Sequence, residues 1–140
     1  MTELERRVLE MLLAGDDPVL DVLRSQLQLA TVASREFSGA GLFTNFHLPS
    51  ETPMLSVPQN FEIGDVSGKL SGKDCGFLLF VRNGAIDFLE GHLWDDGEWP
   101  ASPKIESLYY MHHSPPDSPR LVKTEQRDFT ALRAILHKDQ

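Results

Sequence analysis

The Asn-Gly dipeptide at positions 83 and 84 constrains the fold of this chain more than any other sequence feature. It separates two apolar runs, residues 77–81 and 85–89, and Asn-Gly between such runs is typical of a two-residue type I′ turn. The sequence therefore predicts a β-hairpin. A two-residue turn also fixes the register, so Val81 is expected to face Ile86, with later pairs following in step.

The run at 77–81 is apolar at every position, so it lacks the alternation of apolar and polar residues that is typical of a strand with one solvent-exposed face. We expect this strand to lie in the centre of a sheet, with helices covering at least one of its faces.

Most of the remaining chain shows helical or strand periodicity. Helical spacing predicts a helix over 2–14, a second one started by an Asp17-Pro18 cap, and a third with an apolar stripe near the C-terminus. Alternation with a period of two predicts strands at 29–37, 42–48, 61–70 and 105–111, and the glycines within 61–70 suggest a bulge or a sheet edge.

These elements predict an α+β fold: an antiparallel sheet of about five strands in meander-like hairpins, with two N-terminal helices and a C-terminal helix. At 140 residues the chain has the length of one domain. We assign residues 1–114 to a single α+β domain. Residues 115–140 are expected to form a proline-rich connection and a helix that packs on that domain or extends from it.

The formal net charge of −8 disfavours a nucleic-acid partner, because binding to phosphates requires clustered lysines and arginines. A basic protein partner fits this charge. No apolar stretch approaches the roughly 20 residues that span a bilayer, and the N-terminus lacks a signal-peptide pattern. The single cysteine, Cys75, allows no internal disulfide, so we expect a cytoplasmic protein. No motif predicts a cofactor.

The hairpin register suggests one catalytic constellation. It places Cys75 opposite His92 and on the same face as Glu90, an arrangement from which a nucleophilic cysteine can be built. The alternative is that the lone cysteine is a small buried apolar residue. The five histidines match no metal-binding spacing, so we predict no metal site.

Two further groups are candidates for binding. Arg35 falls on the apolar face of its strand, which suggests either a buried ion pair, with Glu90 as partner, or a ligand-binding arginine. A recognition surface for a basic partner is suggested by acids beside two tryptophans, namely Trp94, Asp95, Asp96 and Trp99. The alternative is a solvated loop whose tryptophans fold back on the sheet.

Two blocks of sequence carry a resemblance to known proteins. They are SREFSGAGLFT at 34–44, and the stretch from GFLLF at 76–80 through LEG at 89–91 to Trp99-Pro100. Over most of residues 4–100 the chain resembles a family of small bacterial proteins of uncharacterised function. The resemblance implies a bacterial source and brings no activity, ligand or catalytic residue.

Three functional hypotheses follow. The first is a non-enzymatic protein-binding module, such as an immunity-like neutraliser of a basic partner. The second is a small hydrolase or transferase that uses Cys75, His92 and Glu90. The third is a self-associating module, such as a homodimer, that pairs through the edge of the strand at 61–70.

Overall fold

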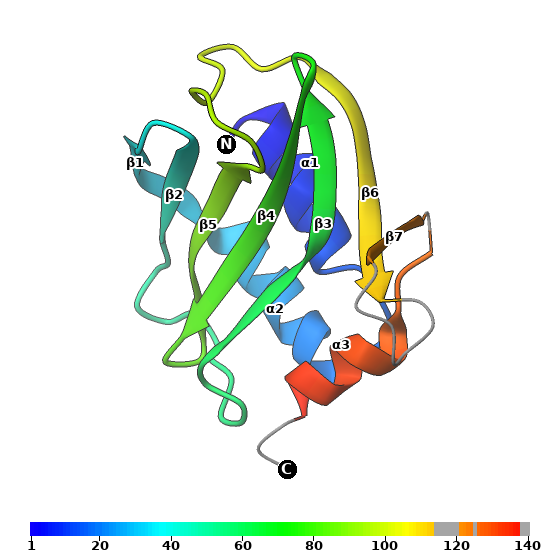
Figure 1. Ribbon diagram of the computed structural model, residues 1–140. Helices are drawn as coiled ribbons and strands as arrows, with labels where there is room; N and C mark the ends of the chain where they lie inside the picture. The colour runs from blue at the N-terminus through cyan, green and yellow to red at the C-terminus, as the bar shows by residue number, and fades with distance from the viewer. Residues whose placement is uncertain (114–120, 125, 138–140) are drawn as a thin grey trace.

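The computed structural model describes residues 1–113, 121–124 and 126–137 (Figure 1). This part of the chain contains three helices and one antiparallel sheet of seven strands in the order β1-β2-β5-β4-β3-β6-β7. The predicted α+β class is confirmed, with seven strands in place of about five. The elements are α1 (Glu3–Leu12), α2 (Pro18–Leu29), β1 (Thr31–Phe37), β2 (Gly41–His47), β3 (Phe61–Leu70), β4 (Lys73–Arg82), β5 (Ala85–Leu93), β6 (Ile105–His113), β7 (Leu121–Thr124) and α3 (Phe129–Leu136).

Helices α1 and α2 cover one face of the sheet and lie behind it in Figure 1. Their starts follow from local sequence: Thr2 and Glu5 form a capping box on α1, and Asp17 caps α2 with Pro18 in its first turn. Each helix buries an apolar stripe against the sheet. No helix among the described residues is long and apolar enough to cross a membrane.

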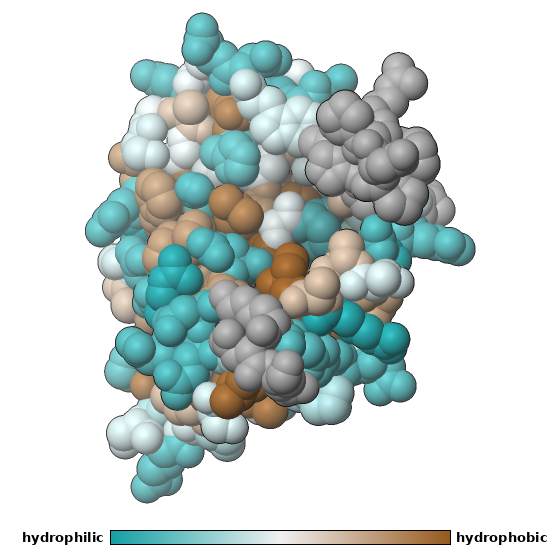
Figure 2. Space-filling view, turned by 60° about the horizontal axis from the view of Figure 1, so that its bottom comes forward, coloured by the Kyte–Doolittle hydropathy of each residue, from teal (hydrophilic) through white to brown (hydrophobic). Residues whose placement is uncertain are grey.

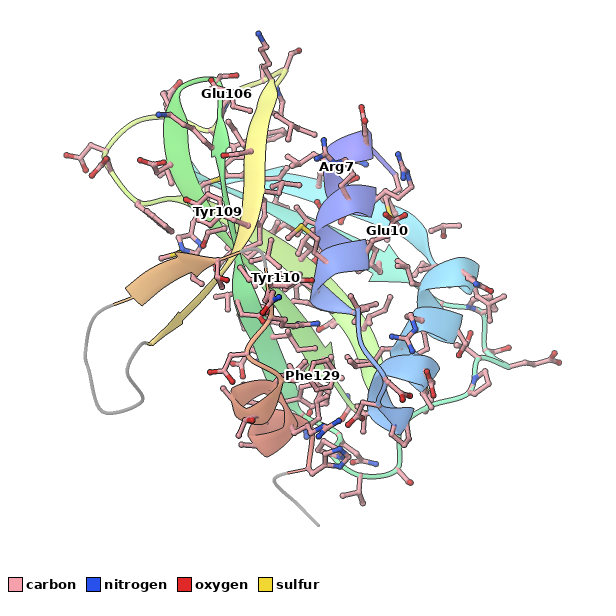
Figure 3. The ribbon with its side chains drawn as sticks, turned by 90° about the vertical axis from the view of Figure 1, so that its right-hand side faces the viewer. Arg7, Glu10, Glu106, Tyr109, Tyr110 and Phe129 are labelled. Atoms are coloured by element: carbon pink, nitrogen blue, oxygen red, sulfur yellow. The ribbon has the colours of Figure 1, made fainter. Side chains whose placement is uncertain are left out.

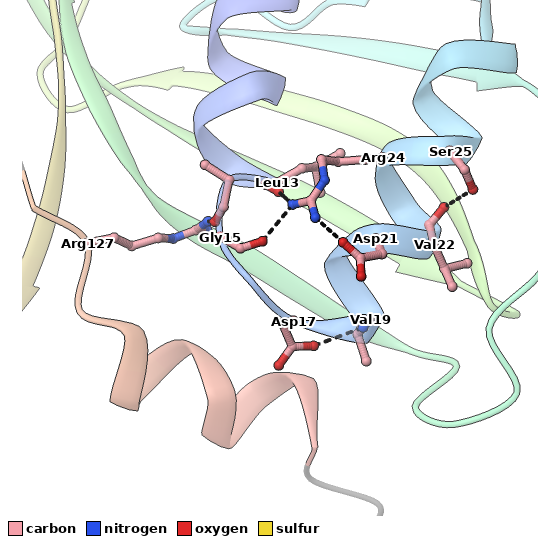
Figure 4. A network of polar contacts seen from close by, with 10 residues as sticks. Leu13, Gly15, Asp17, Val19, Asp21, Val22, Arg24, Ser25 and Arg127 are labelled. Atoms are coloured by element: carbon pink, nitrogen blue, oxygen red, sulfur yellow. Dashed lines mark hydrogen bonds and ion pairs between the residues drawn. The ribbon is translucent and has the colours of Figure 1, made fainter.

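Helix α3 belongs to the same core, because Leu132 and Leu136 are buried in it. Its position is fixed by Arg127, which precedes it and donates to the carbonyls of Leu12 (2.7 Å) and Ala14 (2.8 Å) at the end of α1. Arg24 donates to neighbouring carbonyls of the same turn (Figure 4). Two arginines therefore satisfy carbonyls that the end of α1 leaves unpaired.

The predicted hairpin turn is confirmed. Asn83 and Gly84 have φ values of 54° and 80°, and Val81 pairs with Ile86 as expected. Beyond this pair the register shifts, because Asp87 is an extra residue that forms a β-bulge in β5.

The bulge overturns the pairing on which the catalytic constellation was based. Cys75 faces Leu93, and His92 faces Gly76. A shift of one residue reverses which side chains share a face, so the predicted Cys75–His92 pair was wrong.

Strand β3 contains the predicted bulge, between Ile63 and Val66, but it is not a sheet edge. It pairs with β4 on one side and β6 on the other. Pairing through the edge of β3, as the third hypothesis assumed, is therefore blocked over Val66–Leu70, where β6 occupies that edge. Self-association itself stays a prediction. Within the described part of the chain, the sheet ends at β1 and β7.

The predicted partner of Arg35 was also wrong. Its guanidinium binds Glu5 of α1 through Nε (2.8 Å) and an Nη (2.7 Å), while Glu90 lies on the opposite face of the sheet. Thr44 donates to the same carboxylate at 2.7 Å. Burial by itself would raise the pKa of Glu5, but the hydrogen bonds from Arg35 and Thr44 outweigh it and lower the pKa to about 2. This network joins α1 to the β1–β2 hairpin.

Candidate binding face

The sheet face opposite α1 and α2, which we call the open face, carries the candidate site. Along β4, Phe77 and Leu79 point to the buried core, so the alternate residues Gly76, Leu78 and Phe80 point to the open face. Figure 3 shows the strands from the side, with α1 and α2 on one side of them. Tyr110 of β6 points to that side, since its hydroxyl donates to the carbonyl of Met11 at 2.6 Å.

Small residues lie at the centre of the open face. Ser67 of β3 pairs directly with Gly76 of β4, and Gly64 lies in the bulge of β3. A Cβ on Gly64 would lie only 2.2 Å from Cδ2 of Leu78, so the Leu78 side chain occupies the space over this glycine. Gly64, Ser67 and Gly76 form the floor of a hollow, and the missing side chain of Gly64 makes room for Leu78.

Above this floor is a hollow of about 920 Å³. One wall comes from α3, through Ala131 and Ile135, and Met111 of β6 also lines it. Figure 2, in which the lower end of the molecule comes forward, shows apolar side chains in the middle of the view between hydrophilic ones. The volume lies in the range of small-molecule pockets.

His92 and Trp94 form a polar end to the hollow. A Cβ on Gly76 would lie 3.0 Å from Nε1 of Trp94 and 3.1 Å from Nε2 of His92, so both nitrogens lie directly over this glycine. Nδ1 of His92 is buried and has no hydrogen-bond partner among the described residues. A buried nitrogen without a partner costs about 1–3 kcal/mol, so the site retains unused hydrogen-bonding capacity.

Beside the hollow, the open face carries an aromatic cluster formed by Phe43, Phe80 and Phe88. Phe80 and Phe88 stack at 4.3 Å between centroids, and Phe43 meets Phe88 at 5.9 Å. All three rings are half-buried, and Arg82 lies 5.0 Å from the Phe80 centroid. Carboxylates border the cluster: in the strand register, Glu36 and Glu90 flank Phe43, and Glu62 is opposite Phe80.

The structure does not bring the three predicted catalytic residues together. His92 and Glu90 share the open face, while Cys75 lies in the core and its thiol donates to the carbonyl of Gly68 at 3.5 Å. Burial, and next the charge of Asp74, raise the pKa of Cys75 to about 12. The thiol therefore stays protonated at neutral pH and has no neighbouring imidazole from its paired strand. Among the described residues, no group of acids, histidines and cysteine could hold a metal ion.

The two predicted recognition tryptophans lie on opposite faces of the sheet. Trp99 is buried, 6% exposed, and meets Phe77 edge-on at 6.1 Å, as the alternative of a tryptophan folded back on the sheet predicts. Trp94 is 46% exposed, beside Gly76 on the open face. Asp95 and Asp96 are exposed in the loop between them. Only Trp94 of this group lines the hollow.

The sequence reasoning missed the hollow and the aromatic cluster. A signal for the hollow was present in the small residues of 61–70, whose glycines we interpreted only as a bulge or an edge, and in Gly76, for which we predicted no role. The cluster could not be recognised because the bulge at Asp87 decides that Phe88 lies beside Phe80.

Comparison with protein-family models, curated proteins and solved structures gave no match for this chain.

Proposed function

We propose that this protein is a non-enzymatic binding module that docks a basic partner protein on its open face. The observation that carries the proposal is the aromatic cluster of Phe43, Phe80 and Phe88, which no helix of the described residues covers. Aromatic residues supply much of the binding energy of protein interfaces when they lie at the centre of a less apolar rim.

The charge pattern supports a basic partner. Glu36 and Glu90 border Phe43 in the strand register, while Glu62 opposite Phe80 pairs with Arg82 at 3.6 Å. The whole chain carries a formal charge of −8. Complementary charges of this kind speed association and select among partners, and salt weakens their effect.

The test is a comparison of three baits, the wild type, Phe88→Ser and Phe37→Ser, in affinity capture from native lysate. Phe37 is the matched control, because it is 63% exposed on β1 and lies outside the cluster. We expect the wild type and Phe37→Ser to retain a basic protein. The amount that Phe88→Ser retains should be at least tenfold smaller. Retention should also fall when salt is raised.

Thermal unfolding of each bait shows whether the variants are folded. If a folded Phe88→Ser bait retains the same proteins as the wild type, the open face is not the docking surface and the proposal fails.

A further inference from the structure

We propose that the hollow beside α3 binds an uncharged, largely apolar small molecule that carries a hydroxyl group. This site is distinct from the aromatic cluster, so the inference does not depend on the docking of a protein partner.

The side chains that line the hollow favour a ligand that is mostly apolar. Leu78, Met111, Leu132 and Ile135 line it, together with the exposed indole of Trp94. Burial of apolar ligand surface against such side chains is the main favourable contribution to binding in a pocket of this type. The hollow has room for a fused aromatic ring system, since its volume is about 920 Å³.

The polar end selects a hydroxyl group. The indole Nε1–H of Trp94 only donates, whereas Nε2 of His92 accepts or donates according to the tautomer. Both nitrogens lie over Gly76. The other ring nitrogen of His92, Nδ1, is buried without a hydrogen-bond partner among the residues that the structure describes. A hydroxyl can accept from the indole and donate to the imidazole at the same time, and an aliphatic carbon can do neither.

The charges around the hollow disfavour an anion. Its described lining contains two acids, Asp65 and Asp128, and neither lysine nor arginine. Arg127 forms a bidentate ion pair with Asp65 at 2.7 and 2.9 Å. The guanidinium of Arg127 is therefore not available to a ligand. A carboxylate or phosphate would therefore enter a site without a free cation, at a cost that burial increases.

The first experiment titrates 2-naphthol into the wild-type protein and follows binding by calorimetry. We expect saturable binding to one site with a Kd below about 1 mM, a range that a ligand of this size can reach. Ala131→Trp, which fills the hollow from α3, should weaken binding at least tenfold. Ala134→Trp is the matched control: it places the same side chain on the exposed surface of the same helix, outside the lining, and should bind as the wild type does.

The second experiment tests the hydroxyl. His92→Phe should weaken 2-naphthol about tenfold and leave the affinity for 2-methylnaphthalene unchanged, because only the former uses the imidazole. The anion 2-naphthoate should bind the wild type at least tenfold more weakly than 2-naphthol.

Three results would overturn the inference: no binding of 2-naphthol at 1 mM, equal binding by Ala131→Trp, or tighter binding of 2-naphthoate. None of them would affect the capture of a protein partner through Phe88, so the two proposals fail separately.

Discussion

The two faces of the sheet differ in whether their buried polar groups have hydrogen-bond partners. Under the helices, Glu5 accepts hydrogen bonds from Arg35, Thr44 and the amide of Thr2. Gln26 of α2 donates to the carbonyls of Pro53 and Gly84 and accepts from the amide of Ile86, which joins α2 to the β2–β3 loop and to the β4–β5 hairpin. On the open face, Nδ1 of His92 is buried without a partner among the described residues. The polar groups of Glu5 and Gln26 on the covered face therefore stabilise the fold, whereas the imidazole of His92 on the open face keeps hydrogen-bonding capacity for binding.

The largest difference between the faces is expected in the free energy of unfolding, when two adjacent leucines of β4 are each replaced by alanine. Leu79 is fully buried under the helices, and Leu78 is half-buried on the open face. Leu79→Ala should lower the free energy of unfolding by about 2–5 kcal/mol, because it leaves a cavity in the core. Leu78→Ala should cost only about 1 kcal/mol, since solvent can fill the space. Urea unfolding of both variants measures the difference, and equal losses would show that the open face is also a core.

The next effect concerns the network that joins α1 to the hairpin. Glu5→Gln leaves Arg35 without its charged partner and should lower the free energy of unfolding by about 3 kcal/mol. Glu10→Gln is the control, because its ion pair with Arg6 is exposed and should contribute less than about 0.5 kcal/mol. A loss below about 1 kcal/mol for Glu5→Gln would mean that the network is not important for stability.

The same network gives a pH dependence with a definite sign. The pKa of Glu5 is about 2 in the folded protein and near its ordinary value of 4.5 when unfolded. Its stabilisation, about 3 kcal/mol from this shift, is therefore complete above pH 4.5 and is lost as the pH falls toward 2. The difference in stability between the wild type and Glu5→Gln should shrink over this interval, and a constant difference would contradict the assigned shift.

The smallest effect is expected at His92. His92→Phe removes the nitrogen that has no partner while keeping a ring of similar shape, so it should change the free energy of unfolding by less than about 1 kcal/mol in either direction. Thermal and urea unfolding both test this. A loss as large as that of Glu5→Gln would show that the imidazole is a structural element, and the contrast between the two faces would disappear.

Local signals in the sequence correctly predicted much of the fold. The Asn-Gly turn, the Asp17 cap and the apolar stripes of the helices depend on neighbouring residues, whose conformational preferences act over a few positions. The continuous apolar run of β4 also correctly placed this strand in the centre of the sheet.

The site depends on contacts between distant segments, and the sequence did not reveal it. One extra residue, Asp87, shifts the register and separates Cys75 from His92. Glu5 reaches Arg35 across 30 positions, and α3 meets β3 from the far end of the chain to form the wall of the hollow.

The sequence by itself thus determined which elements form, because turns, caps and periodicity are local. Only the tertiary structure decided which side chains share a face, since that depends on how two bulged strands align and on which helix covers them.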